Sequence, residues 1–177
     1  MRPRNLLFGN LLLASLLGIS LSAMATEQIV VIRSISEDGI GKMIGTVKLS
    51  DSQEGLVLDP DLGELKPGEH GFHVHENPSC EPATKDGKTT AGGAAGSHYD
   101  PAKTGEHQGP KGKGHMGDLP ALVVKDDGSA TSKIVAPRLK LDQLHGRALM
   151  IHEGGDNYSD TPKLGGGAGR IACGVIE

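Results

Sequence analysis

Six histidines and one aspartate between positions 73 and 152 of this 177-residue chain are candidate metal ligands. Two of them, His73 and His75, flank Val74 within an apolar stretch. Residues two apart in a β-strand point to the same face, so both imidazoles would emerge side by side. Such a pair supplies half of a metal site on a rigid support. The alternative for this motif taken alone is a pair of surface histidines.

Four further candidates share one glycine-rich stretch: His98, His107, His115 and Asp118. Three imidazole nitrogens and one carboxylate oxygen form a closed tetrahedral set, which zinc prefers. A solvated polar loop is the alternative, and the number of potential ligands in one region argues against it. His152, the seventh candidate, ends an apolar run, whereas His70 and His145 stay outside the set. The pattern indicates two sites, one rich in imidazole and one mixed, without assigning each ligand to an ion.

The elements that must position these residues are short β-strands. Glycine is abundant, at 27 residues, aromatic residues make up only 2% of the chain, and no sustained helical periodicity is present. Short apolar runs between turn residues favour an all-β domain, either a β-sandwich or a flattened eight-stranded barrel. The expected strands cover residues 29–33, 45–49, 55–58, 71–76, 121–125, 130–136, 148–152 and 170–176.

Two turns and two long loops connect these strands. Glu37-Asp38-Gly39 and Asp126-Asp127-Gly128 have hairpin turn chemistry, and each predicts a hairpin between the strands on either side of it. Residues 77–119 and 153–169 are expected to be long loops without regular structure. A loop of such length is unusual unless it is functional or tied down, and metal ligands within residues 77–119 would provide the ties. The glycine run at 165–169 is not a phosphate loop, because no Lys-Ser/Thr pair follows it.

Residues 1–25 have the layout of a secretory signal peptide. Arg2 and Arg4 precede an apolar stretch, and Ala23-Met24-Ala25 forms a small-x-small cleavage signal. A membrane anchor is the alternative, which the short and interrupted stretch disfavours. We therefore expect one exported domain, residues 26–177, with no membrane contact after cleavage. Without the two leader arginines the formal net charge of −4 becomes −6, and this acidity without a basic cluster disfavours nucleic acid as a partner.

The chain has two cysteines, Cys80 and Cys173. In an oxidising compartment we expect them to form one disulfide, and two buried thiols are the alternative. Because they lie far apart in the chain, closing this loop would stabilise the fold by roughly 4–5 kcal/mol at most on the chain-entropy model.

Five segments carry a resemblance to a known family: Gly71-Phe72-His73-Val74-His75-Glu76, Gly96-Ser97-His98-Tyr99-Asp100-Pro101, Gly114-His115-Met116-Gly117-Asp118-Leu119-Pro120, Ile151-His152-Glu153-Gly154-Gly155-Asp156 and Gly169-Arg170-Ile171-Ala172-Cys173-Gly174-Val175-Ile176. In this order they resemble copper/zinc superoxide dismutase, in its bacterial periplasmic form. The resemblance covers the whole expected domain and departs from the family at no ligand position. It implies a Greek-key β-sandwich.

The resemblance also implies one copper and one zinc ion per chain. Copper would be held by His73, His75, His98 and His152. Zinc would be held by His98, His107, His115 and Asp118, so that His98 bridges the two ions. Asp156 matches the carboxylate that links a copper histidine to a zinc histidine, Arg170 matches the arginine beside the open copper position, and Cys80 and Cys173 match the family disulfide.

The implied activity is disproportionation of superoxide to oxygen and hydrogen peroxide, an antioxidant defence outside the cytoplasm, in the periplasm. Copper would be the redox ion and zinc structural, while His98 would transfer a proton and Arg170 would attract the anion. Lys85, Lys88 and Lys163 lie in the loops and are candidates for steering superoxide. Family members occur as monomers and as homodimers, and the sequence does not distinguish these states. A metal carrier and an adhesive β-sandwich are the rival functions, against which the complete ligand set and the concentration of histidines argue.

Overall fold

The computed structural model describes residues 27–177, apart from the side chains of Lys163 and Leu164. The expected leader, residues 1–25, lies outside the described residues. The strands are β1 (Glu27–Ser36), β2 (Gly39–Ser52), β3 (Gly55–Leu62), β4 (Gly68–His70), β5 (Phe72–His75), β6 (Ala83–Lys85), β7 (Lys88–Thr90), β8 (Leu122–Val124), β9 (Ile134–Ala136), β10 (Arg147–His152) and β11 (Arg170–Ile176). Three short 3₁₀ segments accompany them: η1 (Gly93–Ala95), η2 (Leu141–Gln143) and η3 (Lys163–Gly166). No helix between residues 27 and 177 combines the length and apolar character needed to cross a membrane.

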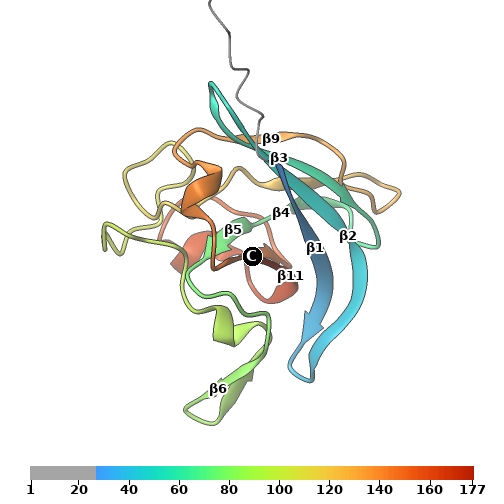
Figure 1. Cartoon of the computed structure of the whole chain (residues 1–177). Coiled ribbons are helices and arrows are strands. Elements are labelled where there is room, and N and C mark those ends of the chain that lie inside the picture. Colours follow the sequence, from blue (N-terminus) through green and yellow to red (C-terminus); the bar gives the residue numbers. More distant parts are fainter. Residues whose placement is uncertain (1–26) are drawn as a thin grey trace, which may run out of the picture.

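Seven strands form one antiparallel sheet in the order β5-β10-β11-β1-β2-β3-β9, and this sheet curls into a half-barrel (Figure 1). Gly71 alone separates β4 from β5, and β4 pairs with β8 in a separate two-stranded sheet. Strands β1, β2 and β3 are consecutive neighbours, whereas the chain crosses over to reach β5 and again to reach β10. The expected all-β Greek-key sandwich is confirmed.

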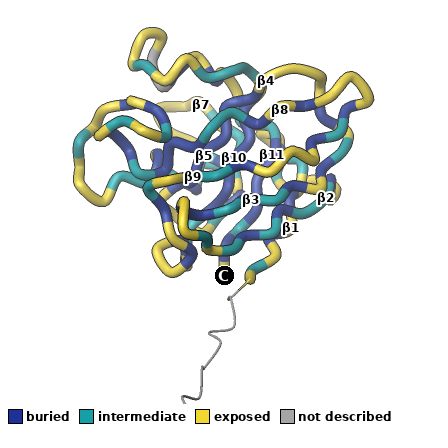
Figure 2. Tube along the Cα trace, turned by 90° about the horizontal axis from the view of Figure 1, so that it is seen from above, coloured by how far each residue is buried: buried dark blue, intermediate teal, exposed yellow. Residues whose placement is uncertain are grey.

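Alternation of side chains explains why these segments become strands. In β1, Val30 and Ile32 are buried while Ile29 and Val31 face outward, as a period of two requires. The buried side chains gather between the two halves of the curled sheet, where Figure 2 shows the chain dark blue. Phe72 is the aromatic residue of this core, and aliphatic side chains supply the rest. Each fully buried aliphatic side chain contributes roughly 1.5–3 kcal/mol, so the many small contacts replace the missing aromatics.

One expected hairpin is wrong. The turn at Asp126-Asp127-Gly128 is present, and the Gly128 N–H donates to the Lys125 carbonyl at 2.9 Å. The strands beside the turn nevertheless part, because β8 pairs with β4 and β9 pairs with β3. Each strand buries its apolar side chains in the main core beside a different partner strand, and that pairing outweighs the local turn preference.

The stretch 77–119 is also more regular than expected. Strands β6 and β7 pair as a short hairpin that projects from the body at the bottom of Figure 1, and η1 follows. Asp86 and Gly87 both have positive φ, at 53° and 76°, which is the conformation that a two-residue hairpin turn requires. The Asp-Gly pair was therefore a usable signal, but the flanking residues are polar and mostly exposed.

Cys80 and Cys173 form the expected disulfide. Cys173 lies in β11 on the outer face of the sheet, and Cys80 lies at the start of the loop that precedes β6. Their side chains pack with Ile35, Ala148 and Met150 in a small apolar cluster separate from the main core. The disulfide therefore fixes the first part of the long loop onto the outer face of β10 and β11.

Replacing both cysteines, Cys80→Ser with Cys173→Ser, is expected to lower the free energy of unfolding by about 2–5 kcal/mol, because the cross-link no longer restricts the unfolded chain. Urea denaturation of the metal-free protein measures this difference. Ser132→Ala on an exposed segment is the control and should leave the midpoint unchanged. Equal stability of the double variant and the parent would contradict the prediction.

Candidate metal centre

Two neighbouring strands position three of the candidate histidines. Strand β5 pairs with β10 in a register that sets His73 opposite Met150 and His75 opposite Ala148. Phe72 and Val74 point into the main core, so His73 and His75 emerge together on the outer face, as their spacing predicts. His152 ends β10, and its N–H donates to the Gly71 carbonyl at 2.9 Å, which holds it at the same end of the strand pair.

The other edge of β5 holds the long loop. Val74 donates to the Gly117 carbonyl at 2.9 Å, and Tyr99 donates to the Val74 carbonyl at 2.8 Å. These contacts set His98 opposite His75 and Asp118 opposite His73 in short antiparallel bridges. The loop is thus added to the sheet edge by backbone hydrogen bonds, and it brings two more candidates beside the first three.

Asp118 organises the mixed cluster. Its Oδ1 atom lies 3.0 Å from His98 Nδ1, 3.0 Å from His107 Nδ1 and 3.4 Å from His115 Nδ1. Its Oδ2 atom accepts hydrogen bonds of 3.2 Å from the backbone N–H groups of Gln108 and Gly109. One carboxylate oxygen is therefore fixed by the backbone, while the other faces three imidazoles.

The described residues include two groups of four whose ligand atoms, within each group, all lie within 4.8 Å of one another. The first group is His73, His75, His98 and His152, and the second is His73, His98, His107 and Asp118. His73 and His98 belong to both groups. His115 falls outside the second group as these distances define it, although its Nδ1 atom is directed at the same carboxylate oxygen. All seven expected ligands are thus brought together on one outer face of the sandwich.

The unpaired nitrogens of these rings test whether metal ions fit. Among the described residues, buried ring nitrogens without a hydrogen-bond partner are His73 Nδ1, His75 Nε2, His98 Nε2, His107 Nδ1, His115 Nδ1 and both nitrogens of His152. Leaving a buried polar atom unpaired costs about 1–3 kcal/mol, so seven in one place need a common explanation. Imidazole nitrogen is a ligand for both copper and zinc, and two ions would satisfy six of these seven atoms, leaving one nitrogen of His152.

Asp156 connects the two groups from the second long loop. Its buried carboxylate accepts a hydrogen bond from His73 Nε2 at 2.7 Å and another from His107 Nε2 at 2.8 Å. Gly165 packs directly on this carboxylate with φ at +72°, and a Cβ atom there would collide with Asp156 Oδ1. The glycine run at 165–169 therefore lets the second loop close over the Asp156 carboxylate.

Burial and neighbouring charges set the protonation of the cluster. Burial lowers the pKa of His73, and it lowers the pKa of His98 to about 4. Burial, with nearby His98 and Arg170, lowers the pKa of His75 and His152 well below the usual range. These four rings are neutral at neutral pH and keep a lone pair for a metal ion. Burial also opposes charging of His107, but its contacts with the carboxylates of Asp118 and Asp156 outweigh it and raise its pKa to about 9.

The pKa of both carboxylates is lowered. Burial alone would raise the pKa of Asp118 and Asp156, but contacts with the neighbouring imidazoles hold the pKa of each well below its ordinary value. These imidazoles are His107 and His98 for Asp118, and His107 and His73 for Asp156. Both side chains are therefore charged at neutral pH. A buried pair of negative groups beside neutral imidazoles favours a bound cation.

Arg170 lies beside the four-histidine group. Its Nη1 donates to the Gly92 carbonyl at 2.6 Å, and its Nη2 donates to the Gly96 carbonyl at 2.7 Å. The same Gly96 oxygen accepts a hydrogen bond of 3.0 Å from His75 Nδ1. Arg170 also lines a surface hollow with Glu37, Lys88 and Thr90, so part of this side chain reaches the surface. Of the lysines expected to steer superoxide, Lys88 borders this hollow. The side chain of Lys163 is not among the described parts of the structure.

Two supporting residues gave no signal in the sequence. His70 is buried, with Nδ1 2.6 Å from the His152 carbonyl and Nε2 2.8 Å from the Lys66 carbonyl, so it supports the backbone of a candidate ligand. Asp160 accepts from the His107 N–H at 3.1 and 3.2 Å and ties the second long loop to the first. Neither residue could be found by spacing, because each acts on a backbone group.

A β-sandwich with two adjoining clusters of buried imidazoles on its outer face defines a metalloprotein with a paired metal centre. The family model for copper/zinc superoxide dismutase matches residues 43–176. A superoxide dismutase [Cu-Zn] from Escherichia coli K12 is 53% identical over 161 residues, which cover 90% of this chain and 93% of that protein.

Solved structures give the same result. The copper/zinc superoxide dismutase from Brucella abortus has a TM-score of 0.84 at 52% identity, and it covers 86% of this chain and 100% of that one. The monomeric enzyme from Salmonella enterica has a TM-score of 0.78 at 54% identity with the same coverage. The chain belongs to the copper/zinc superoxide dismutase family. It is an oxidoreductase that acts on superoxide and uses copper and zinc.

Asp156→Asn should weaken zinc binding about 10–100-fold, since an amide cannot accept from both His73 and His107 without turning an N–H group toward one of them. Titration against a chromophoric chelator measures the affinity. Asp126→Asn removes a carboxylate from an exposed loop and is the matched control. Zinc affinity that is the same in Asp156→Asn and the parent would show that the carboxylate does not orient these rings.

Proposed function

We propose that copper binds His73, His75, His98 and His152, that zinc binds His98, His107, His115 and Asp118, and that one ion of each kind per chain supports disproportionation of superoxide. The observation that carries this proposal is the set of buried, unpaired ring nitrogens that converge from β5, β10 and the long loop. Two superoxide ions and two protons give one oxygen and one hydrogen peroxide. The reaction therefore needs a one-electron centre, a proton carrier and an anion site.

Hydrogen bonds of the individual rings support the assignment of the ligand atoms. His75 Nδ1 donates to the Gly96 carbonyl, which leaves Nε2 with the lone pair. His73 and His107 each donate from Nε2 to Asp156, which leaves both Nδ1 atoms free. His98 has no backbone acceptor for either nitrogen, with Nδ1 toward Asp118 and Nε2 unpaired. Only His73 and His98 belong to both groups, and Asp156 occupies one nitrogen of His73, so His98 is the shared ring suited to bridge two ions.

The choice of His115 over His73 for zinc follows from the number of lone pairs. His73 has a single free nitrogen, because Asp156 occupies the other, and the four-histidine group needs that nitrogen. The Nδ1 atom of His115 is buried and unpaired, and it faces the same oxygen of Asp118 as His98 and His107. Three nitrogens and one oxygen then complete a tetrahedral zinc site.

When bound, copper supplies one-electron redox chemistry, and zinc supplies fixed positive charge without redox chemistry. His98 holds a proton at Nε2 in one half of the reaction and delivers it toward peroxide in the other. Arg170 binds and orients the anion through the donors that Gly92 and Gly96 leave free, and a forked guanidinium suits that role. Lys88, on the same hollow, adds positive charge at its rim.

We further infer that the enzyme works outside the cytoplasm, in the periplasm, as an antioxidant defence, after removal of residues 1–25 from a single domain that begins at residue 26. The disulfide supports this inference, because such bonds persist in oxidising compartments. One chain carries every proposed ligand together with Arg170, so the chemistry requires no second copy. A monomer and a homodimer are therefore equally compatible with activity.

His73→Ala should abolish superoxide removal while zinc stays bound, because the change takes away one copper ligand and no zinc ligand. His115→Ala should do the reverse for the metals, with loss of zinc and retention of copper. Metal analysis of the purified proteins and an assay of superoxide removal, with and without a chelator, measure both effects. His145→Ala changes an exposed histidine and is the control. Turnover that survives His73→Ala, or full copper occupancy without activity in the parent, would overturn the proposal.

Arg170→Ile should slow turnover by about tenfold or more and weaken its dependence on ionic strength, since the protein loses its charge at the anion site. Pulse radiolysis at several salt concentrations measures both quantities. Arg33→Ile removes an exposed arginine from β1 and serves as the matched control. An unchanged rate and salt response would rule out the proposed role of Arg170.

A further inference from the structure

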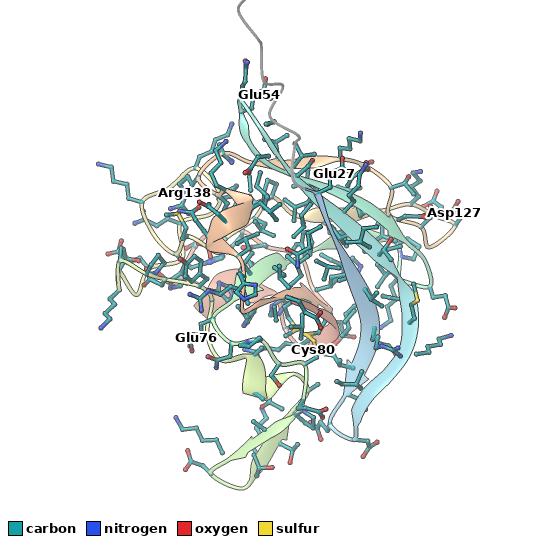
Figure 3. All side chains as sticks on the ribbon, in the orientation of Figure 1. Glu27, Glu54, Glu76, Cys80, Asp127 and Arg138 are labelled. Atoms are coloured by element: carbon teal, nitrogen blue, oxygen red, sulfur yellow. A yellow bond between two sulfur atoms is a disulfide. The ribbon has the colours of Figure 1, made fainter. Side chains whose placement is uncertain are left out.

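Arg138 makes an unusual set of contacts with the zinc-binding loop. It lies just after β9, in the other half of the sandwich from β5 (Figure 3). Its guanidinium donates to the carbonyls of Pro110 from Nε, of Gly114 from Nη1 and of Gly109 from Nη2, each at 3.1 Å. Nη2 also donates to the carbonyl of His115. Four acceptors from one seven-residue segment, 109–115, thus surround one side chain.

This segment has little structure of its own. Gly112 donates to the Gly109 carbonyl at 3.3 Å, and His115 donates to the Glu106 carbonyl at 2.9 Å. Its inward carbonyls therefore need donors from elsewhere, and a guanidinium offers five in a rigid planar fork. Hydrogen bonds from a charged donor are roughly twice as strong as those between neutral groups. Among the described residues no carboxylate forms an ion pair with Arg138, so the four carbonyls are what its charge faces.

The same residues also hold the metal ligands. The Gly109 carbonyl accepts from Arg138, while the Gly109 N–H donates to Asp118 Oδ2 at 3.2 Å. The His115 carbonyl accepts from Arg138, while its ring faces Asp118 Oδ1. A shift of the guanidinium would therefore move the backbone of His115 and the donor that fixes the Asp118 carboxylate.

We propose that Arg138 is an internal cation that shapes the zinc-binding loop before the ion arrives, and so is a positioning residue for His115 and Asp118. The inference rests on the proposed zinc site. Arg138 contacts neither the ion nor the substrate, and it acts through the four carbonyls. Its contribution is to the affinity and geometry of the zinc site, not to the redox step.

The experiment compares Arg138→Gln, Arg138→Lys and the control Arg33→Gln, which removes the same charge from an exposed position. Zinc affinity of the metal-free proteins is measured by chelator competition, and cobalt(II) absorption reports the geometry of the same site. Arg138→Gln should bind zinc about 10–100-fold more weakly, with an altered cobalt spectrum. Arg138→Lys keeps the positive charge but not the planar set of guanidinium donors, so its zinc affinity should lie between those of Arg138→Gln and the parent. Arg33→Gln should match the parent.

Hydrogen–deuterium exchange separates preorganisation from a general loss of stability. In the metal-free Arg138→Gln protein, peptides that cover residues 105–117 should exchange faster, while peptides of β1 and β2 should exchange at the parental rate. Should Arg138→Gln fail to fold, Arg138→Lys provides the same comparison.

The outcomes distinguish this inference from the assignment of the zinc ligands. His115→Ala is the reference, because it removes a proposed ligand directly. If His115→Ala weakens zinc binding and both Arg138 variants bind like the parent, the positioning role is overturned and the zinc site stands. If His115→Ala leaves zinc affinity unchanged, the zinc site is wrong and the role of Arg138 falls with it.

Discussion

The whole centre depends on a strand with two occupied edges. One edge of β5 pairs with β10, and the other edge accepts the long loop through Val74, Gly117 and Tyr99. This one arrangement aligns histidines from two strands with histidines and an aspartate from a loop that has little regular structure. The rigid side of the site is supplied by the sheet, and the adaptable side is fitted to it by backbone hydrogen bonds. A loop held only by metal ions would have no defined shape until the ions were bound.

Hydrogen bonds around the rings turn a cluster of imidazoles into two different sites. When one nitrogen of an imidazole ring donates to a carbonyl or carboxylate, the other nitrogen of that ring keeps the lone pair. Asp156 does this for one ring in each group, and so a single buried carboxylate orients ligands on both sides of His98. Burial keeps the rings of the four-histidine group neutral, whereas the carboxylates beside His107 retain negative charge. The same protein surface thereby offers a neutral site of four imidazoles next to a site that combines imidazoles with a charged carboxylate.

The sequence predicts the residues whose side chains are candidate metal ligands. It does not predict residues whose hydrogen-bond partners are backbone groups. The period of two in 72–75 placed His73 and His75 on one face, and the strands that supply the curled sheet were largely found from their apolar runs. The Asp126-Asp127-Gly128 turn misled the pairing of β8 and β9, because a turn motif is local and the choice of partner strand depends on which half of the core each strand covers. Arg138 and His70 were missed because carbonyl acceptors leave no mark in a sequence.

The Gly96 carbonyl accepts from both His75 and Arg170, so one peptide group serves a ring of the proposed copper site and the guanidinium proposed to bind the anion. An insertion, deletion or bulkier residue in this part of the loop would disturb both proposed roles together. Evolution therefore cannot adjust one property here while it leaves the other fixed. Variation in substrate capture among relatives is expected to arise further out, in the β6–β7 hairpin, where the chain can change without touching that shared oxygen.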